Sequence, residues 1–120
     1  MADSIIAKKS YDFALLIIRT AQQLRHQHKE YVLTKQLLRS GTSIGANAEE
    51  ATSAESRADF IHKMSIALKE ARETSYWLRL LHDSNYLSDA DFYQVHEQCR
   101  EIIKILSSII LTTKKSANNS

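Results

Sequence analysis

Apolar side chains recur every three or four residues along most of this chain, the spacing that places them on one face of an α-helix. Polar stretches interrupt the repeat at residues 26–30, 53–55 and 82–85. The pattern predicts four helices of roughly 20 residues each, and short links between helices favour antiparallel neighbours. We therefore predict an all-α fold, an up-down-up-down antiparallel four-helix bundle over residues 1–111, followed by a flexible C-terminal tail at residues 112–120.

Each predicted helix carries an apolar seam that should face the bundle core. The first helix, from about residue 4 to residue 28, has Phe13, Ile17 and Leu24 in this position. The other three seams are Leu37, Gly41, Ile44, Ala48 and Ala51, then Phe60, Met64, Ala67, Ala71, Thr74, Leu78 and Leu81, then Phe92, Val95, Cys99, Ile102, Leu106 and Ile109.

Polar residues that accept backbone N–H groups mark the predicted helix starts. Ser56 with Asp59, and Ser88 with Asp91, have the spacing of a cap followed by an acid in the first turn. Thr34 is the corresponding candidate for the second helix.

Gly41 and Gly45 lie inside the second predicted helix, where each costs about 1 kcal/mol relative to Ala. Their presence indicates that another backbone packs very close to this face. The alternative is a helix broken at residues 40–43.

Two apolar surfaces exceed what a single bundle needs. The run from Phe13 to Ile18 surrounds the first helix, and Ile103 and Ile110 broaden the seam of the fourth. Because large exposed apolar patches usually mark interfaces, we expect a homo-oligomer.

Composition limits the remaining classes. A chain of 120 residues with no Pro and two Gly fits one small helical domain. The single cysteine, Cys99, has no intramolecular disulfide partner, and the N-terminus lacks a signal-peptide pattern, which predicts a cytoplasmic location. No apolar stretch is long enough to cross a membrane, so we expect no membrane partner.

Positive charge is concentrated at the start of the chain, although the net charge is only +2. We predict that the basic residues there bind the phosphates of RNA or DNA without reading sequence, since no aromatic stacking platform is evident. The alternative is a solvated helix face. The candidate contacts are Lys8, Lys9, Arg19, Arg25, Lys29, Lys35 and Arg39.

A polar stripe, Ser40, Ser43, Asn47 and Glu50, runs beside the small-residue seam of the second helix. Acidic residues on the third helix face it in a bundle. We predict a structural polar network between helices, formed by Ser43, Asn47, Glu50, Glu70 and Glu73. The alternative is a carboxylate-metal site, but the Glu-x-x-His pairs of di-metal bundles are missing. We expect no metal and no cofactor.

Cys99 lies on an apolar seam and reads as a core residue, and no catalytic motif accompanies it. The sequence therefore predicts no enzymatic activity and no catalytic residues.

The segment from Leu38 to Ala51 resembles the signature of the four-helix-bundle family encoded in intervening sequences of 23S rRNA genes. The matching positions are Ser43, Ile44, Asn47 and Glu50, followed by Phe60, Met64, Ala67, Glu70 and Glu73. The resemblance implies a small up-down bundle that assembles into a ring, typically a pentamer. Accessory variability proteins of diversity-generating retroelements look like relatives, which implies nucleic-acid binding and contact with a protein partner such as a reverse transcriptase.

Together these observations predict a non-enzymatic oligomeric bundle that binds nucleic acid and acts as an accessory or scaffold. A purely structural or protein-interaction module is the first alternative. A carboxylate-metal enzyme is the second.

Overall fold

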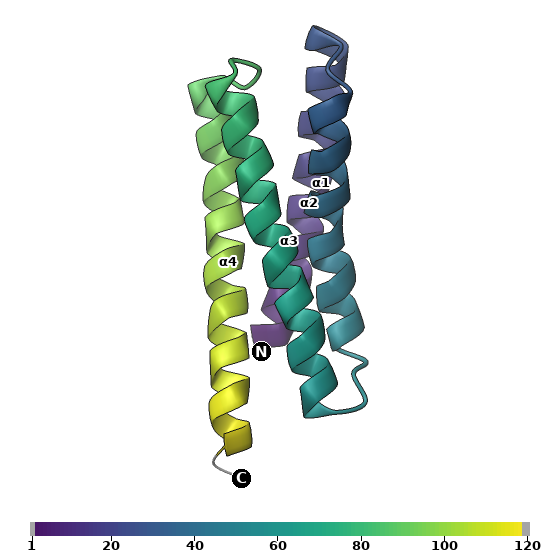
Figure 1. The fold of residues 1–120 in the computed structure, drawn as a ribbon, viewed down its shortest axis with the longest axis vertical. Helices are drawn as coiled ribbons and strands as arrows, with labels where there is room; N and C mark the ends of the chain where they lie inside the picture. The colour runs from purple at the N-terminus through teal and green to yellow at the C-terminus, as the bar shows by residue number, and fades with distance from the viewer. Residues whose placement is uncertain (1, 119–120) are drawn as a thin grey trace.

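The computed structural model describes residues 2–118, which form four helices: α1 (Ala2–His28), α2 (Val32–Ala51), α3 (Arg57–Asp83) and α4 (Asp89–Asn118). Figure 1 shows the helices running alternately up and down along a molecule that measures 53 × 21 × 20 Å. Each helix packs against the next, and α1 also packs against α4, which closes the bundle. The predicted up-down-up-down antiparallel four-helix bundle is confirmed.

The predicted seams form the core. Phe13 and Ile17 of α1 are fully buried, and every seam residue of α2 is buried. The seams of α3 and α4 are also buried, except that Phe60 and Phe92 at their N-terminal ends are half-buried. The four helices are held together by burial of one apolar stripe on each helix. The helical repeat of apolar residues therefore identifies the core.

Two of the predicted helix caps are present. The Ser56 hydroxyl accepts a hydrogen bond from the Asp59 N–H at 3.0 Å, and the Ser88 hydroxyl accepts one from the Asp91 N–H at 3.1 Å. Each cap satisfies a backbone donor that has no partner within its own helix.

The predicted Thr34 cap is wrong, because α2 begins two residues earlier, at Val32. The Glu30 carboxylate caps this helix by accepting the N–H groups of Val32, Leu33 and Thr34 at 3.1, 2.9 and 2.9 Å. Glu30 can reach all three donors because its side chain is longer and its two oxygens both accept. The negative charge also lies at the positive end of the helix dipole.

α2 is continuous through both glycines, so the alternative of a helix broken at residues 40–43 is wrong. A Cβ on Gly45 would lie 3.4 Å from the carbonyl carbon and oxygen of Ser10, so the backbone of α1 does pack closely here. Gly41 lies against the side chain of Ile17. The small-residue seam therefore sets the close approach of α1 and α2.

α4 continues as a helix to Asn118, beyond the end predicted at residue 111. No Gly or Pro interrupts this segment, the Thr113 hydroxyl donates to the Ile109 carbonyl at 2.7 Å, and Lys115 lies in the last turn, where the helix dipole favours a cation. The flexibility expected for residues 112–118 stays a prediction, and residues 119–120 lie outside the described part of the chain.

Candidate nucleic-acid interface

The seven candidate basic residues do not form one surface. Lys8 and Lys9 lie near the start of α1, about 30 Å along the bundle from Lys29, given a rise of about 1.5 Å per helical residue. Lys8 forms an ion pair with Asp12 at 2.8 Å, and Lys9 lies 3.6 Å from Glu101 of α4. Both charges are therefore partly balanced by neighbouring carboxylates.

Arg39 links α2 to α3. Its Nη1 lies 3.1 Å from an oxygen of Glu70, and its Nη2 donates to Glu73. The Trp77 indole N–H also donates to Glu73, at 3.2 Å. Two carboxylates thus surround one guanidinium, so Arg39 has a structural role at the α2–α3 contact and little charge left for a polyanion.

Arg19 is exposed on the side of α1 that faces α4. It lines a groove of about 300 Å³ together with Leu87, Asp91 and Gln94. The carboxylate of Asp91 in the same groove opposes an approaching phosphate, so Arg19 is a weaker candidate than its exposure indicates.

The remaining three residues gather where α1 connects to α2. The Arg25 Nε donates to the Thr34 hydroxyl at 2.8 Å, and the guanidinium carbon lies 5.9 Å from the centre of the Tyr31 ring. Lys29 and Lys35 are exposed, and no carboxylate within the described residues forms an ion pair with Arg25, Lys29 or Lys35. We call Arg25, Lys29, Tyr31 and Lys35 the tip patch.

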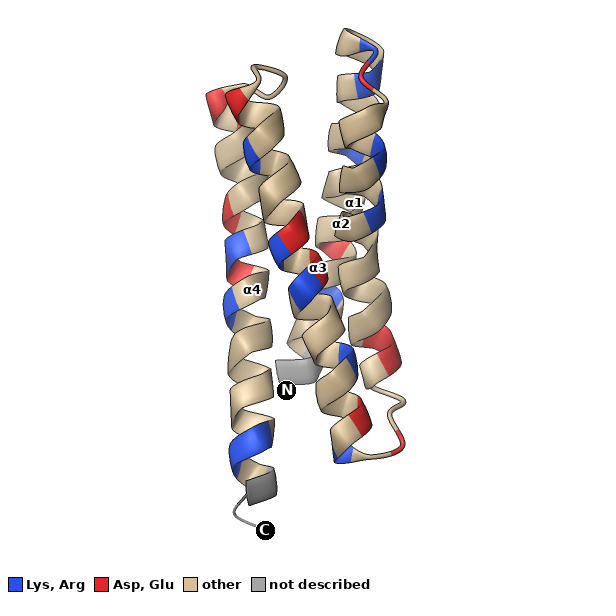
Figure 2. Cartoon of the chain, viewed as in Figure 1, with Lys and Arg blue, Asp and Glu red and all other residues tan. Residues whose placement is uncertain are grey.

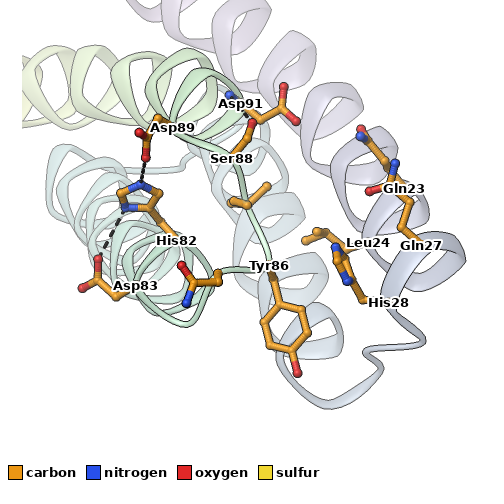
Figure 3. Close-up of a pocket in the computed structure, with 12 residues that line it drawn as sticks. Gln23, Leu24, Gln27, His28, His82, Asp83, Tyr86, Ser88, Asp89 and Asp91 are labelled. Carbon is orange, nitrogen blue, oxygen red and sulfur yellow. Dashed lines mark hydrogen bonds and ion pairs between the residues drawn. The ribbon is translucent and has the colours of Figure 1, made fainter.

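Figure 2 shows basic residues along the upper part of the α1–α2 pair, at the end of the bundle that holds the tip patch. The α3–α4 connection, at the same end, carries acidic residues instead. Asp83, Asp89 and Asp91 line an open cavity of about 740 Å³ between this connection and the end of α1 (Figure 3). At this end of the bundle, the α1–α2 connection therefore favours a polyanion and the α3–α4 connection disfavours one.

His82 lies between two of these carboxylates. Its Nε2 lies 2.7 Å from the Asp89 carboxylate and its Nδ1 lies 3.4 Å from the Asp83 carboxylate, as the dashed lines in Figure 3 mark. Across the cavity, the His28 ring contacts the Tyr86 ring edge-on, with the centres 5.4 Å apart. No group of three or more His, Cys, Asp or Glu in the described part of the chain is placed to hold a metal ion.

The five residues of the predicted polar network fall into two groups according to their partners. Ser43 and Asn47 hydrogen-bond to the backbone of α2 itself, through the carbonyls of Arg39 and Ser43 at 2.7 and 2.9 Å. Glu50 pairs with Lys63 at 3.2 Å, while Glu70 and Glu73 share Arg39. The three glutamates thus join α2 to α3 through basic partners rather than through Ser43 and Asn47.

One buried polar contact was missed. The hydroxyls of Ser40 and Thr74 lie 2.8 Å apart, and both residues are fully buried between α2 and α3. The available signal was the Thr74 hydroxyl on the apolar seam of the third helix, together with Ser40 beside the facing seam of the second.

Cys99 is buried, as predicted. Its thiol donates to the Ala71 carbonyl at 3.2 Å, and burial raises the pKa of the Cys99 thiol to about 12. The thiolate, which is the reactive form, is therefore nearly absent at neutral pH.

His96 lies beside this part of the core. It stacks on Phe92 with ring centres 4.7 Å apart, and its Nε2 is hydrogen-bonded to the Ser75 hydroxyl at 2.8 Å. Burial, followed by the charges of Arg100 and Arg79, lowers the pKa of His96 below its ordinary value.

The geometry defines the class of protein: a closed antiparallel helical bundle with a basic α1–α2 connection and an acidic α3–α4 connection at the same end. None of the described helices is long and apolar enough to cross a membrane.

The chain matches the model of the 23S rRNA-intervening sequence protein family over residues 2–108, and it belongs to that family. A solved structure with the same fold is that of a protein of unknown function from the S23 ribosomal protein family of Bacteroides thetaiotaomicron. The two chains are 49% identical, with a TM-score of 0.90 over 92% of this chain and 98% of that one. No curated protein matches this chain significantly. The resemblance seen in the sequence is confirmed.

Proposed function

We propose that this protein is a non-enzymatic, oligomeric bundle of the cytoplasm that binds the phosphate backbone of RNA or DNA and acts as an accessory or scaffold. The tip patch carries the proposal, because its three cations have no carboxylate partner among the described residues. The nearby Glu30 carboxylate, which accepts three N–H groups at the start of α2, offsets one of these three charges and leaves a net excess of +2. Unbalanced cations of this kind supply the sequence-independent part of nucleic-acid affinity.

Exposed apolar residues support self-association. Within the run that surrounds α1, Phe13 and Ile17 are buried but Leu15 is 40% exposed. A largely apolar groove of about 680 Å³ lies between α1 and α2, lined in part by Tyr11, Leu15 and Ala46. A second copy would remove this surface from water, and the resemblance makes a pentamer the preferred assembly. A protein partner such as a reverse transcriptase rests on the resemblance alone.

The test is fluorescence anisotropy of a labelled structured RNA at about 50 and about 200 mM salt, because phosphate-driven binding weakens as counterions are released. The double variant Arg25→Ala, Lys29→Ala should bind more weakly and show a shallower salt dependence. Lys104→Ala, Lys114→Ala removes the same charge from exposed positions of α4 and should bind as the wild type does. Equal binding by both double variants would contradict the assigned surface, and light scattering tests the oligomer directly.

A protein-interaction module without nucleic acid is the second candidate. The ion pairs of Lys8, Lys9 and Arg39 favour it, since these three charges are used within the chain. This candidate predicts a stable oligomer and no RNA binding at about 50 mM salt, where phosphate contacts are strong. A carboxylate-metal enzyme has less support, because Arg39 occupies the side of Glu70 and Glu73 where a cation would bind.

A further inference from the structure

An exposed aromatic ring stands at the centre of the tip patch. Tyr31 is 55% exposed, and it differs from the other exposed tyrosines, Tyr11, Tyr76 and Tyr93, in lying within the tip patch. The Arg25 guanidinium lies 5.9 Å from the ring centre, in the range of a cation–π contact, and Arg25 is itself held by the Thr34 hydroxyl. The ring is thus supported on one side by a fixed cation while much of its surface remains open to solvent.

Two further cations flank this ring in the sequence. Lys29 has φ of 54°, in the left-handed region, and its N–H donates to the Arg25 carbonyl at 3.1 Å, so α1 ends at His28, three residues before Tyr31. Lys35 follows Tyr31, the N-cap residue of α2, by four residues, so it lies about one helical turn further along. Val32, also exposed, adds apolar surface beside the ring.

We propose that the tip patch binds single-stranded nucleic acid, with an unpaired base stacked on Tyr31 and neighbouring phosphates on Arg25, Lys29 and Lys35. This inference rests on the proposed function and names its substrate class. An aromatic ring with basic neighbours is the usual means of holding an unpaired base, and stacking tolerates any base because every base has a π-face. A single ring on a convex tip has no access to bases that are already stacked within a duplex.

The charges around the patch also set the path of the strand. The acidic residues of the α3–α4 connection lie across the cavity from α1, so they repel phosphates from the inner side of the tip. The strand therefore follows the outer side of the α1–α2 hairpin. The sequence had indicated no stacking platform, because a lone tyrosine in a link between helices carries no recognisable pattern.

The experiment compares a labelled 12-nucleotide oligouridine with a labelled 12-base-pair duplex by fluorescence anisotropy at about 50 mM salt, with full-length protein. We expect tighter binding of the single strand. Tyr31→Ala should weaken that binding about tenfold and leave duplex binding nearly unchanged, in line with the energy of base–aromatic stacking. Tyr31→Phe keeps the ring and should bind as the wild type does.

Two further variants test whether binding requires a flat ring and whether it requires that ring at position 31. Tyr31→Leu retains apolar bulk without a flat ring and should lose most of the preference for the single strand. Tyr93→Ala removes a tyrosine that is 68% exposed on α4, and it should have no effect on binding. An unchanged helical circular dichroism signal in every variant shows that binding, and not folding, has been altered.

The outcomes separate the inference from the function on which it rests. If Tyr31→Ala binds the single strand normally while Arg25→Ala, Lys29→Ala binds weakly, the stacking site is wrong and the phosphate surface stands. Equal affinity of wild-type protein for single strand and duplex also overturns the inference. If wild-type protein binds neither probe, the proposed function fails and the inference fails with it.

Discussion

Gly41 of α2 faces Ile17 of α1 so closely that a Cβ on Gly41 would lie 2.8 Å from Ile17 Cγ2 and 2.9 Å from Cγ1. Ile17 is fully buried, and its branched Cβ leaves it few alternative rotamers. The contact therefore explains why a glycine stands in the middle of a helix. Gly45 differs from Gly41, since a Cβ on Gly45 would lie 3.4 Å from its nearest neighbours, the atoms of Ser10.

Gly41→Ala should lower the free energy of unfolding by up to about 2 kcal/mol, because overpacking a core costs about 1–3 kcal/mol and the gain in helix propensity offsets about 1. Gly45→Ala is the matched control and should be neutral or more stable by up to about 1 kcal/mol. Urea unfolding followed by circular dichroism measures both. A more stable Gly41→Ala protein would mean that Ile17 can move aside.

Substitutions of Arg39 and Lys35 should have different effects on protein stability and on RNA binding. Arg39→Ala leaves Glu70 and Glu73 without their guanidinium, and we expect a loss of about 1 kcal/mol of unfolding free energy, allowing for the exposure of the pair to solvent. Lys35→Ala, at an exposed position, should leave stability unchanged and weaken RNA binding. Urea unfolding and anisotropy on both variants make the comparison. The reverse pattern would place the interface along the α2–α3 side.

His96 should make stability depend on pH. Because the folded pKa of His96 is lowered, the unfolded chain binds its proton more readily, and the stabilisation is complete above the unfolded value of about 6.5. It is lost as pH falls from about 6.5 toward the folded pKa. His96→Gln removes this titration, so its unfolding free energy should fall less than that of the wild type between pH 7.5 and pH 5. Parallel curves for the two proteins would argue against the assignment.

Cys99 should resist thiol reagents in the folded protein. Its raised pKa and its burial predict no reaction with Ellman's reagent at pH 8 on a timescale of minutes, and complete reaction in denaturant. Release of thionitrobenzoate, measured by absorbance, follows the reaction. Rapid labelling of the native protein would show that α4 opens locally from the core.

The features of the fold that could be predicted depend on residues that lie close together in the sequence. The seams around Leu37 and Leu78 follow from a repeat that any stable helix of a bundle must have. Ser56 and Ser88 cap helices through bonds to residues only three positions away, so the sequence contains both partners. The Thr34 prediction failed because Glu30, with a longer reach, competes for the same donors and the choice depends on how the connection turns.

The candidate site was less predictable, because the availability of a charge depends on distant residues. Lys9 meets Glu101, and Arg39 meets Glu70 and Glu73, across helix contacts that spacing along one helix does not reveal. A count of basic residues therefore overestimated the surface. Tyr31 was overlooked for the same reason, since its exposure is a property of the folded connection.

The order in which the helices pack has a consequence for folding speed. The three connections are only residues 29–31, 52–56 and 84–88, and each joins helices that lie side by side. Most contacts are therefore close in sequence, which is typical of chains that fold within microseconds to milliseconds. Among the described helices, only α1 and α4 bring together segments from opposite ends of the chain. We expect this contact to carry the largest loop-closure entropy, so that α1 packs against α4 last.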